Sequence, residues 1–190
     1  MKAYDFVDKQ IMKGVNKGVR AWNYTTGRTK TDLANLLLYA APVVEAAGLI
    51  STHGAVGAMF YPICVWISYV AQRDNKTLEQ IEKKAMSEQM MVNPNGPHHR
   101  KLKLRSAYWG SCSLVQGCTS FVSKDHQIEL GLGLMSAGHA TRSLSHYISR
   151  ADPLPPGKSI FEKAGEKLNE MISDAVRKPV PVRAFNLEDI

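Results

Sequence analysis

Residues 33–72 read LANLLLYAAPVVEAAGLISTHGAVGAMFYPICVWISYVAQ and carry one formal charge, Glu45, and one imidazole, His53. The stretch divides at residues 51–54 into two apolar pieces. Each piece is close to the ~20 residues that an α-helix needs to cross a hydrocarbon core of about 30 Å. This pattern predicts a helical hairpin that either spans a membrane or fills the centre of a helical bundle.

The excess positive charge of the chain lies on both sides of this hairpin. The net charge is +7 over 190 residues. Residues 1–33 hold seven basic and three acidic residues, residues 73–105 hold eight and four, and residues 106–190 hold nine of each. The hairpin turn itself is uncharged. Because basic residues accumulate on the cytoplasmic side of membrane proteins, this distribution predicts a cell-membrane location with both hairpin ends cytoplasmic.

Glu45 is the residue of the hairpin that least resembles its surroundings. An ionisable group at the centre of a membrane helix is costly, and by default it indicates a functional site or a buried partner. Pro42, one turn earlier, removes a backbone donor and tends to kink a helix. We therefore take Glu45 as a candidate buried functional carboxylate. The alternative is a soluble helix that turns Glu45 toward water.

Helical patterns also flank the hairpin. Before it, Val7, Ile11, Val15, Val19 and Trp22 recur at helical spacing among lysines, a pattern typical of an interfacial helix or of a surface helix packed on a core. After it, Thr77 and Gln80 form a capping box that indicates the start of a soluble helix.

The whole chain thus divides into five parts. These are a basic amphipathic helix and turn (1–32), the apolar hairpin (33–72), an amphipathic helix and basic loop (73–106), a second weakly apolar helical region (107–150), and a Pro-rich linker with a soluble helix and extended C-terminal arm (151–190).

Residues 106–123 contain no charge, yet serine, glycine and glutamine make them too polar for a confident membrane span. Residues 127–149 follow, with several glycines among leucines. Together they form a possible second hairpin broken at residues 124–126, and packing against the first hairpin is its expected role. Four apolar segments would make a compact helical bundle in either lipid or water.

Two sets of polar residues are candidate binding sites. The most basic run, residues 98–105, suits phosphate contact with anionic lipid head groups or nucleic acid, or forms a solvated surface. Its candidate contacts are His98, His99, Arg100, Lys101, Lys103 and Arg105. His139 and His146 share a helical face and are weak candidates for haem or metal ligation. No carboxylate or cysteine completes a ligand set with them, so we expect no cofactor.

The chain contains no phosphate-binding loop, nucleophile elbow or zinc-protease motif. The expectation is therefore an all-α membrane protein without catalytic activity. It would support packing or assembly of a larger transport, secretion or electron-transfer complex, with other subunits or further copies of itself as partners. The alternatives are a soluble basic helical protein that binds nucleic acid through residues 98–105, and a histidine-ligated haem or metal protein.

Overall fold

The structure is a computed structural model that describes residues 2–88 and 96–177. All of its regular elements in these ranges are helices. They are α1 (Lys2–Thr26), α2 (Lys30–His53), α3 (Ala55–Ala58), α4 (Tyr61–Ser87), α5 (Pro97–Val122), α6 (His126–Ser149) and α7 (Ile160–Arg177). The expected all-α fold is confirmed. The expected C-terminal arm, from residue 178 onward, lies outside the described residues.

The predicted central hairpin is present as α2, the single turn α3 and α4. Thr29 caps α2, with its side chain accepting from the backbone of Asp32 while the Asp32 carboxylate accepts from the Thr29 backbone. Gly54 ends the helix at φ +59°, a left-handed conformation that glycine adopts without steric penalty. The capping box expected at Thr77 is absent, because α4 continues through it to Ser87 and the Thr77 hydroxyl donates to the Arg73 carbonyl.

The second half of the chain also forms a hairpin, from α5 and α6. The basic run 98–105, expected as a loop, is instead the first two turns of α5. Gly96 and Pro97 explain why α5 starts at this position, since proline suits the first turn of a helix. The break falls at residues 123–125, close to the expected 124–126, and Asp125 caps α6 by accepting from two backbone amides.

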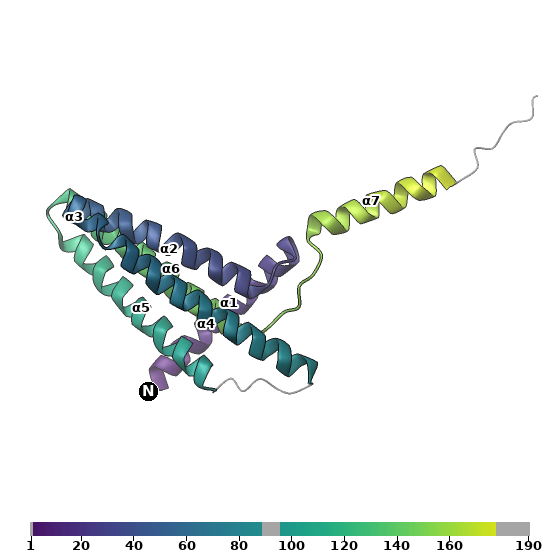
Figure 1. The fold of residues 1–190 in the computed structure, drawn as a ribbon, viewed down its shortest axis with the longest axis horizontal. Coiled ribbons are helices and arrows are strands. Elements are labelled where there is room, and N and C mark those ends of the chain that lie inside the picture. Colours follow the sequence, from purple (N-terminus) through teal and green to yellow (C-terminus); the bar gives the residue numbers. More distant parts are fainter. Residues whose placement is uncertain (1, 89–95, 178–190) are drawn as a thin grey trace, which may run out of the picture.

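Four long helices, α2, α4, α5 and α6, lie side by side and form the body of the molecule (Figure 1). α6 packs against both α2 and α5, and α2 also packs against α4. Small residues let α2 and α6 approach closely, because a Cβ added at Gly48 would lie only 2.6 Å from the Gly131 carbonyl oxygen. The turns of both hairpins lie at one end of this bundle, joined by a hydrogen bond from Ser51 to the Gln127 carbonyl.

Many polar side chains are buried in the interior of the bundle, while many large apolar side chains lie on its exterior. Hydroxyl groups link the helices: Ser143 of α6 donates to the Ser106 carbonyl of α5, and Ser145 donates to the Ala34 carbonyl of α2. The buried apolar cluster is small, with Val19, Ala34, Ile148 and Ala151 at its centre. Large apolar side chains instead face outward, among them Tyr39, Val43, Val56, Met59, Ile63, Trp66, Tyr69, Leu114, Val115, Phe121 and Leu130.

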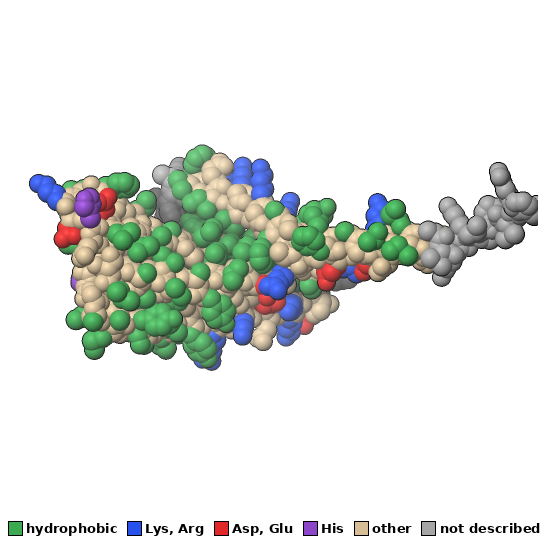
Figure 2. All heavy atoms as spheres, turned by 90° about the horizontal axis from the view of Figure 1, so that it is seen from above, with side chains coloured by type: hydrophobic (Ala, Val, Ile, Leu, Met, Phe, Trp, Pro, Cys, Tyr) green, Lys and Arg blue, Asp and Glu red, His purple; other side chains and the backbone are tan. Residues whose placement is uncertain are grey.

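Charged side chains gather at the two ends of the body. Figure 2 shows hydrophobic side chains covering much of the visible face between a small charged tip at the α3 end and a larger charged group near the start of α7. α1 is joined to the bundle by Arg150, which follows the last residue of α6 and donates twice to Asp8, at 2.8 Å for each bond. α7 then extends away from the body (Figure 1).

Candidate functional site: the Glu45–Arg142 network

Glu45 of α2 and Arg142 of α6 form an ion pair inside the four-helix body. The Arg142 Nε donates to Glu45 Oε1 at 2.5 Å, and its Nη2 donates to Oε2 at 2.6 Å. This is the two-bond geometry that matches a planar guanidinium to a carboxylate. Glu45 is 3% exposed and Arg142 is 1% exposed. The structure therefore turns Glu45 toward a buried partner rather than toward water.

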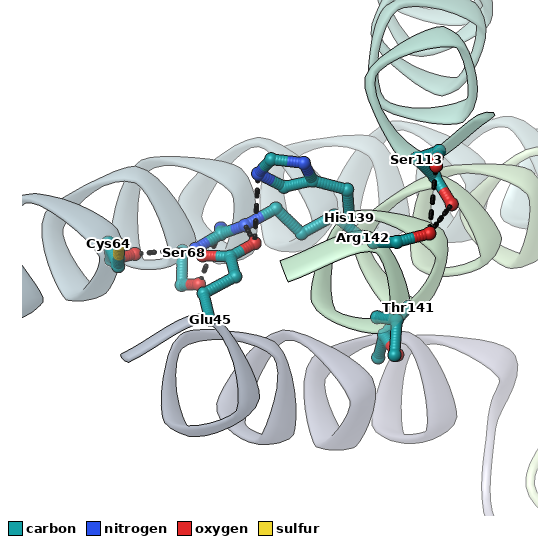
Figure 3. A network of polar contacts seen from close by, with 9 residues as sticks. Glu45, Cys64, Ser68, Ser113, His139, Thr141 and Arg142 are labelled. Atoms are coloured by element: carbon teal, nitrogen blue, oxygen red, sulfur yellow. Dashed lines mark hydrogen bonds and ion pairs between the residues drawn. The ribbon is translucent and has the colours of Figure 1, made fainter. Parts of the chain in front are cut away.

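The remaining donors of Arg142 reach α4. Nη1 donates to the Ser68 hydroxyl at 2.7 Å, and Nη2 also donates to the Cys64 carbonyl at 2.8 Å. Figure 3 shows these contacts converging on the guanidinium from both sides. On α5, the Trp109 ring lies 5.3 Å from the guanidinium carbon. One arginine thus contacts the three other helices of the body, and four hydrogen bonds and an aromatic face replace the water around its charge.

A glycine makes room for this pair. A Cβ added at Gly138, one turn before Arg142, would lie 2.4 Å from the Glu45 Cγ and 3.2 Å from the Ala41 carbonyl oxygen. The carboxylate can therefore occupy the α2–α6 interface only because residue 138 has no side chain. Pro42 does not end the helix, since α2 continues to His53.

His139 lies beside the ion pair but is not hydrogen-bonded to it. Its Nε2 is 3.8 Å from Glu45 Oε1, which exceeds hydrogen-bond distance, and its ring lies 4.9 Å from that of Trp109 (Figure 3). His146 lies two turns further along α6 and is 1% exposed. The Nδ1 atoms of both histidines are buried without a hydrogen-bond partner among the described residues.

The two histidines do not form a metal centre with other side chains in the described part of the chain. No three histidine, cysteine, aspartate or glutamate side chains come together there in a way that could hold a metal ion. The arrangement around Glu45 is thus an ion pair with hydrogen-bonding neighbours. This arrangement can hold two opposite charges in the interior between the helices.

The basic run forms helix-to-helix ion pairs at the charged end of the body. Lys101, at 2.9 Å, and Arg105 both pair with Asp74 of α4. Lys103 pairs with Asp5 of α1 at 3.0 Å. Three of the six candidate phosphate contacts thus already contact carboxylates, and the remaining three are His98, His99 and Arg100.

His98 and Arg100 are exposed, whereas His99 is half-buried. Burial lowers the pKa of His99, and the nearby charge of Lys30 lowers it further. His99 therefore favours its neutral form. His98 and Arg100 are the residues of the run whose side chains remain open to an anionic group in solution.

Two ion pairs at this end escaped the sequence analysis. Lys30 is 4% exposed and donates to Glu82 at 2.7 Å and to the Ala151 carbonyl at 2.5 Å, so it joins α2, α4 and the segment after α6. The other is the Asp8–Arg150 pair, in which the hydrogen bonds from Arg150 hold the pKa of the Asp8 carboxyl below its usual range. Neither partner follows the other at helical spacing, so periodicity carries no signal for these pairs.

Comparison with protein families, with curated proteins and with solved structures finds no match to this chain.

Proposed function

We propose that the chain is an integral membrane protein whose four long helices cross the bilayer as an antiparallel bundle. The observation that carries the proposal is that each helix of the body contains a segment with almost no charged side chains. Residues 33–53, 54–72, 106–123 and 130–149 contain two charged side chains between them, and these two pair with each other. The shortest segment, at 1.5 Å per helical residue, is about 27 Å long, close to the hydrocarbon thickness of a bilayer.

The outward orientation of apolar side chains supports the same proposal. Two helical stretches, Lys30–His53 and Ala55–Ser87, are long and apolar enough to span a membrane. The core helix of a soluble protein passes the same test but is mostly buried. Here 22% of the most apolar window of the second stretch is buried. Contiguous apolar surface of this kind is rare on soluble monomers and is typical of contact with lipid or another protein.

The polar interior supports a membrane-type packing as well. Lipid tails are as apolar as leucine, so membrane helices associate through small residues and interhelical hydrogen bonds. The Gly48–Gly131 approach is of this type. So is the contact between Ser113 and Ser136, in which the Ser136 hydroxyl donates to the Ser113 carbonyl at 2.8 Å. Such serines lower the hydropathy of residues 106–149, yet their partners are other helices. The low hydropathy therefore does not keep this region out of the bilayer, and we propose that it enters.

The excess of basic residues gives the orientation. Residues 1–33 and 73–105 hold the positive excess, and both flank the end of the body opposite to the hairpin turns. We place this end in the cytoplasm and the turns across the membrane. The open side chains of His98 and Arg100 then lie on the side where anionic lipid head groups concentrate.

The proposed role is non-catalytic support of a larger membrane complex. α7 extends away from the body, and one face of it exposes Phe161, Leu168, Met171 and Ile172. Its charged residues have both signs, which favours a protein partner over an anionic bilayer. Other subunits or a second copy of the chain are the partners that such a face suits.

Alkaline carbonate extraction of membranes from expressing cells tests the proposal. The full chain should stay in the pellet, whereas a co-expressed peripheral protein is released. Release of the chain into the supernatant would refute membrane integration. A chain ending at residue 157 should also stay in the pellet yet migrate as a smaller assembly on a native gel. An unchanged assembly size would refute the role given to α7.

A further inference from the structure

The two halves of α1 are attached to the body in different ways, and the C-terminal half is attached by packing and backbone contacts. Val19 is 1% exposed and lies in the small apolar cluster with residues of α2 and α6. Asn23 donates to the Pro155 carbonyl at 3.1 Å. This half is therefore fixed on the body without any charged group.

The N-terminal half of α1, residues 2–13, is attached mainly through charge. Asp8 is buried and Met12 is half-buried, whereas the large apolar side chains of Phe6 and Val7 are exposed. A helix held by apolar packing buries its apolar side chains and exposes its charged ones. Here the most deeply buried side chain is a carboxylate, so its partners hold this half in place.

Two carboxylates of this half contact two cations of the body. Asp8 accepts two hydrogen bonds from Arg150 and lies 3.6 Å from the Lys103 ammonium. Lys103 also pairs with Asp5 at 3.0 Å, beside the start of α5 (Figure 1). The charged groups around Asp8 are thus Lys103 of α5, Arg150 after α6, and Asp5 of α1 itself. The Asp8–Arg150 pair is the stronger attachment, because it is buried and has two charge-assisted hydrogen bonds.

The same half of α1 contributes to a groove between α5 and α6. The groove has a volume of about 490 Å³, and Ile11 lines it together with Ser106 and Gly110 of α5 and Ser143 and Tyr147 of α6. Movement of this half away from the body would withdraw Ile11 and open the groove further.

Gly14 and Gly18 separate the charged half of α1 from the packed half. A Cβ added at either position would meet no atom within 4 Å, so neither glycine is needed for a close helix contact. Glycine weakens the interior of a helix by about 1 kcal/mol relative to alanine and permits backbone conformations that other residues avoid. α1 is therefore easiest to bend between its two halves.

We propose that residues 2–13 form a lid that is hinged at Gly14 and Gly18 and held closed by the Asp8–Arg150 ion pair. The structure shows the closed state, in which Ile11 lines the groove between α5 and α6. When the pair breaks, the lid swings away while Val19 keeps the rest of α1 on the body. The proposal does not depend on the membrane location, because every contact that carries it lies within the protein.

Protonation of Asp8 opens the lid. The hydrogen bonds from Arg150 hold the pKa of the Asp8 carboxyl below its usual range, so the closed state is favoured at neutral pH. On an open lid this carboxyl has an ordinary pKa of about 3.9. The closed state therefore keeps its full advantage well above this value and loses it as pH falls through the lower pKa of the closed state.

Double electron–electron resonance on the full chain in detergent measures the position of the lid. Spin labels are attached at Gln10→Cys and Arg100→Cys, which are exposed positions of α1 and α5. The native cysteines are first replaced by alanine at Cys64, Cys112 and Cys118. The distance distribution should be narrow at pH 7. In Asp8→Asn a second, longer distance should appear, with the open-to-closed ratio raised about tenfold or more, because hydrogen bonds between charged groups contribute more than those to a neutral amide.

Asp152→Asn is the matched control for the loss of a carboxylate. Asp152 pairs with Arg20 of α1 at 3.6 Å, on the C-terminal side of both glycines, so this variant should keep the lid closed. The protein with Asp8 intact gives the same test by pH alone, since its longer distance should grow as pH falls from 7 to about 3. A distribution at pH 7 that Asp8→Asn leaves unchanged would overturn the proposal. So would equal opening by Asp152→Asn.

The hinge is tested in the Asp8→Asn protein by adding Gly14→Ala and Gly18→Ala. Alanine stiffens the helix, and both positions have room for the extra methyl group. The population with the longer distance should therefore fall several-fold. An unchanged population would show that α1 does not bend at these glycines and would overturn the hinge.

Discussion

Removing either member of the Glu45–Arg142 pair should destabilise the bundle strongly, whereas replacing both should not. Glu45→Leu leaves the Arg142 guanidinium buried with the Ser68 hydroxyl and the Cys64 carbonyl as its acceptors. Arg142→Met removes the two hydrogen bonds that the Glu45 carboxylate accepts from the guanidinium. Each single change thus strands one charge in a closed interior.

The size of the effect follows from the burial of both groups. Breaking a buried ion pair by removing one partner costs about 3–5 kcal/mol, because the remaining charge is uncompensated. Replacing both partners by apolar side chains of similar volume is often neutral or stabilising by about 1–4 kcal/mol. The sum of the single effects should therefore exceed the effect of the double change by several kcal/mol. Membrane insertion itself should survive Glu45→Leu.

Unfolding of the detergent-solubilised protein in sodium dodecyl sulfate provides the assay, followed by circular dichroism for the wild type, both single variants and the double variant. The four unfolding free energies form a double-mutant cycle. Leu130→Ala, an exposed position on the same helix as Arg142, is the control and should change little if it contacts detergent. Single effects below about 0.5 kcal/mol, or a double effect equal to their sum, would refute the reasoning.

Three further predictions concern helix packing, pH dependence and membrane depth. Gly138→Ala places a Cβ 2.4 Å from the Glu45 Cγ and should cost about 1–3 kcal/mol in thermal unfolding. Gly133→Ala meets nothing within 4 Å and should be neutral or slightly stabilising; equal effects would contradict the packing argument. Because the pKa of Asp8 is lowered in the folded state, its stabilising effect is complete well above the unfolded value of about 3.9 and is lost as pH falls through the folded value. The thermal stability of the wild type should thus exceed that of Asp8→Asn by a constant margin above about pH 5, and the margin should shrink below about pH 4; a margin independent of pH would count against it. Cys118 is exposed on α5 within an uncharged segment, so a hydrophilic maleimide should label it in unfolded protein but not in intact liposomes. Rapid labelling in liposomes would place this segment in water.

The sequence predicts the first hairpin well because its signal is strong and local. Hydrophobic composition marks both pieces, and Gly54 lies at their turn. The predicted boundary at residue 73 falls within α4, which continues to Ser87. Charged residues begin at residue 73, but α4 continues, because a helix can extend beyond its apolar segment.

The second hairpin shows why hydropathy underestimates some segments. Serines at 106, 113, 136, 143 and 145 lower the apolar average of α5 and α6. In the structure the hydroxyls of Ser136, Ser143 and Ser145 donate to carbonyls of neighbouring helices, whereas the Ser106 hydroxyl donates to the Lys103 carbonyl of its own helix. A polar residue whose partner is another helix cannot be distinguished by composition from one that contacts water.

The candidate site shows the same limit. The sequence singles out Glu45 because a charge in an apolar segment requires a partner, and it places Arg142 between two histidines on one helical face. It does not connect them, because 97 positions separate the two residues and only the packing of α2 on α6 brings them together. Nothing in the sequence singles out Gly138, because its role depends on the packing of α2 on α6.

Fluorescence of a single-tryptophan variant in liposomes tests the central claim most directly. Trp66 is 65% exposed on α4, two residues from the Ser68 that Arg142 contacts, so the proposed bundle places it deep in the acyl chains. With Trp22 and Trp109 replaced by phenylalanine, lipids brominated in mid-chain should quench its emission strongly, and aqueous iodide should not. Quenching by iodide without quenching by brominated lipid would show that this surface faces water and would contradict the membrane bundle.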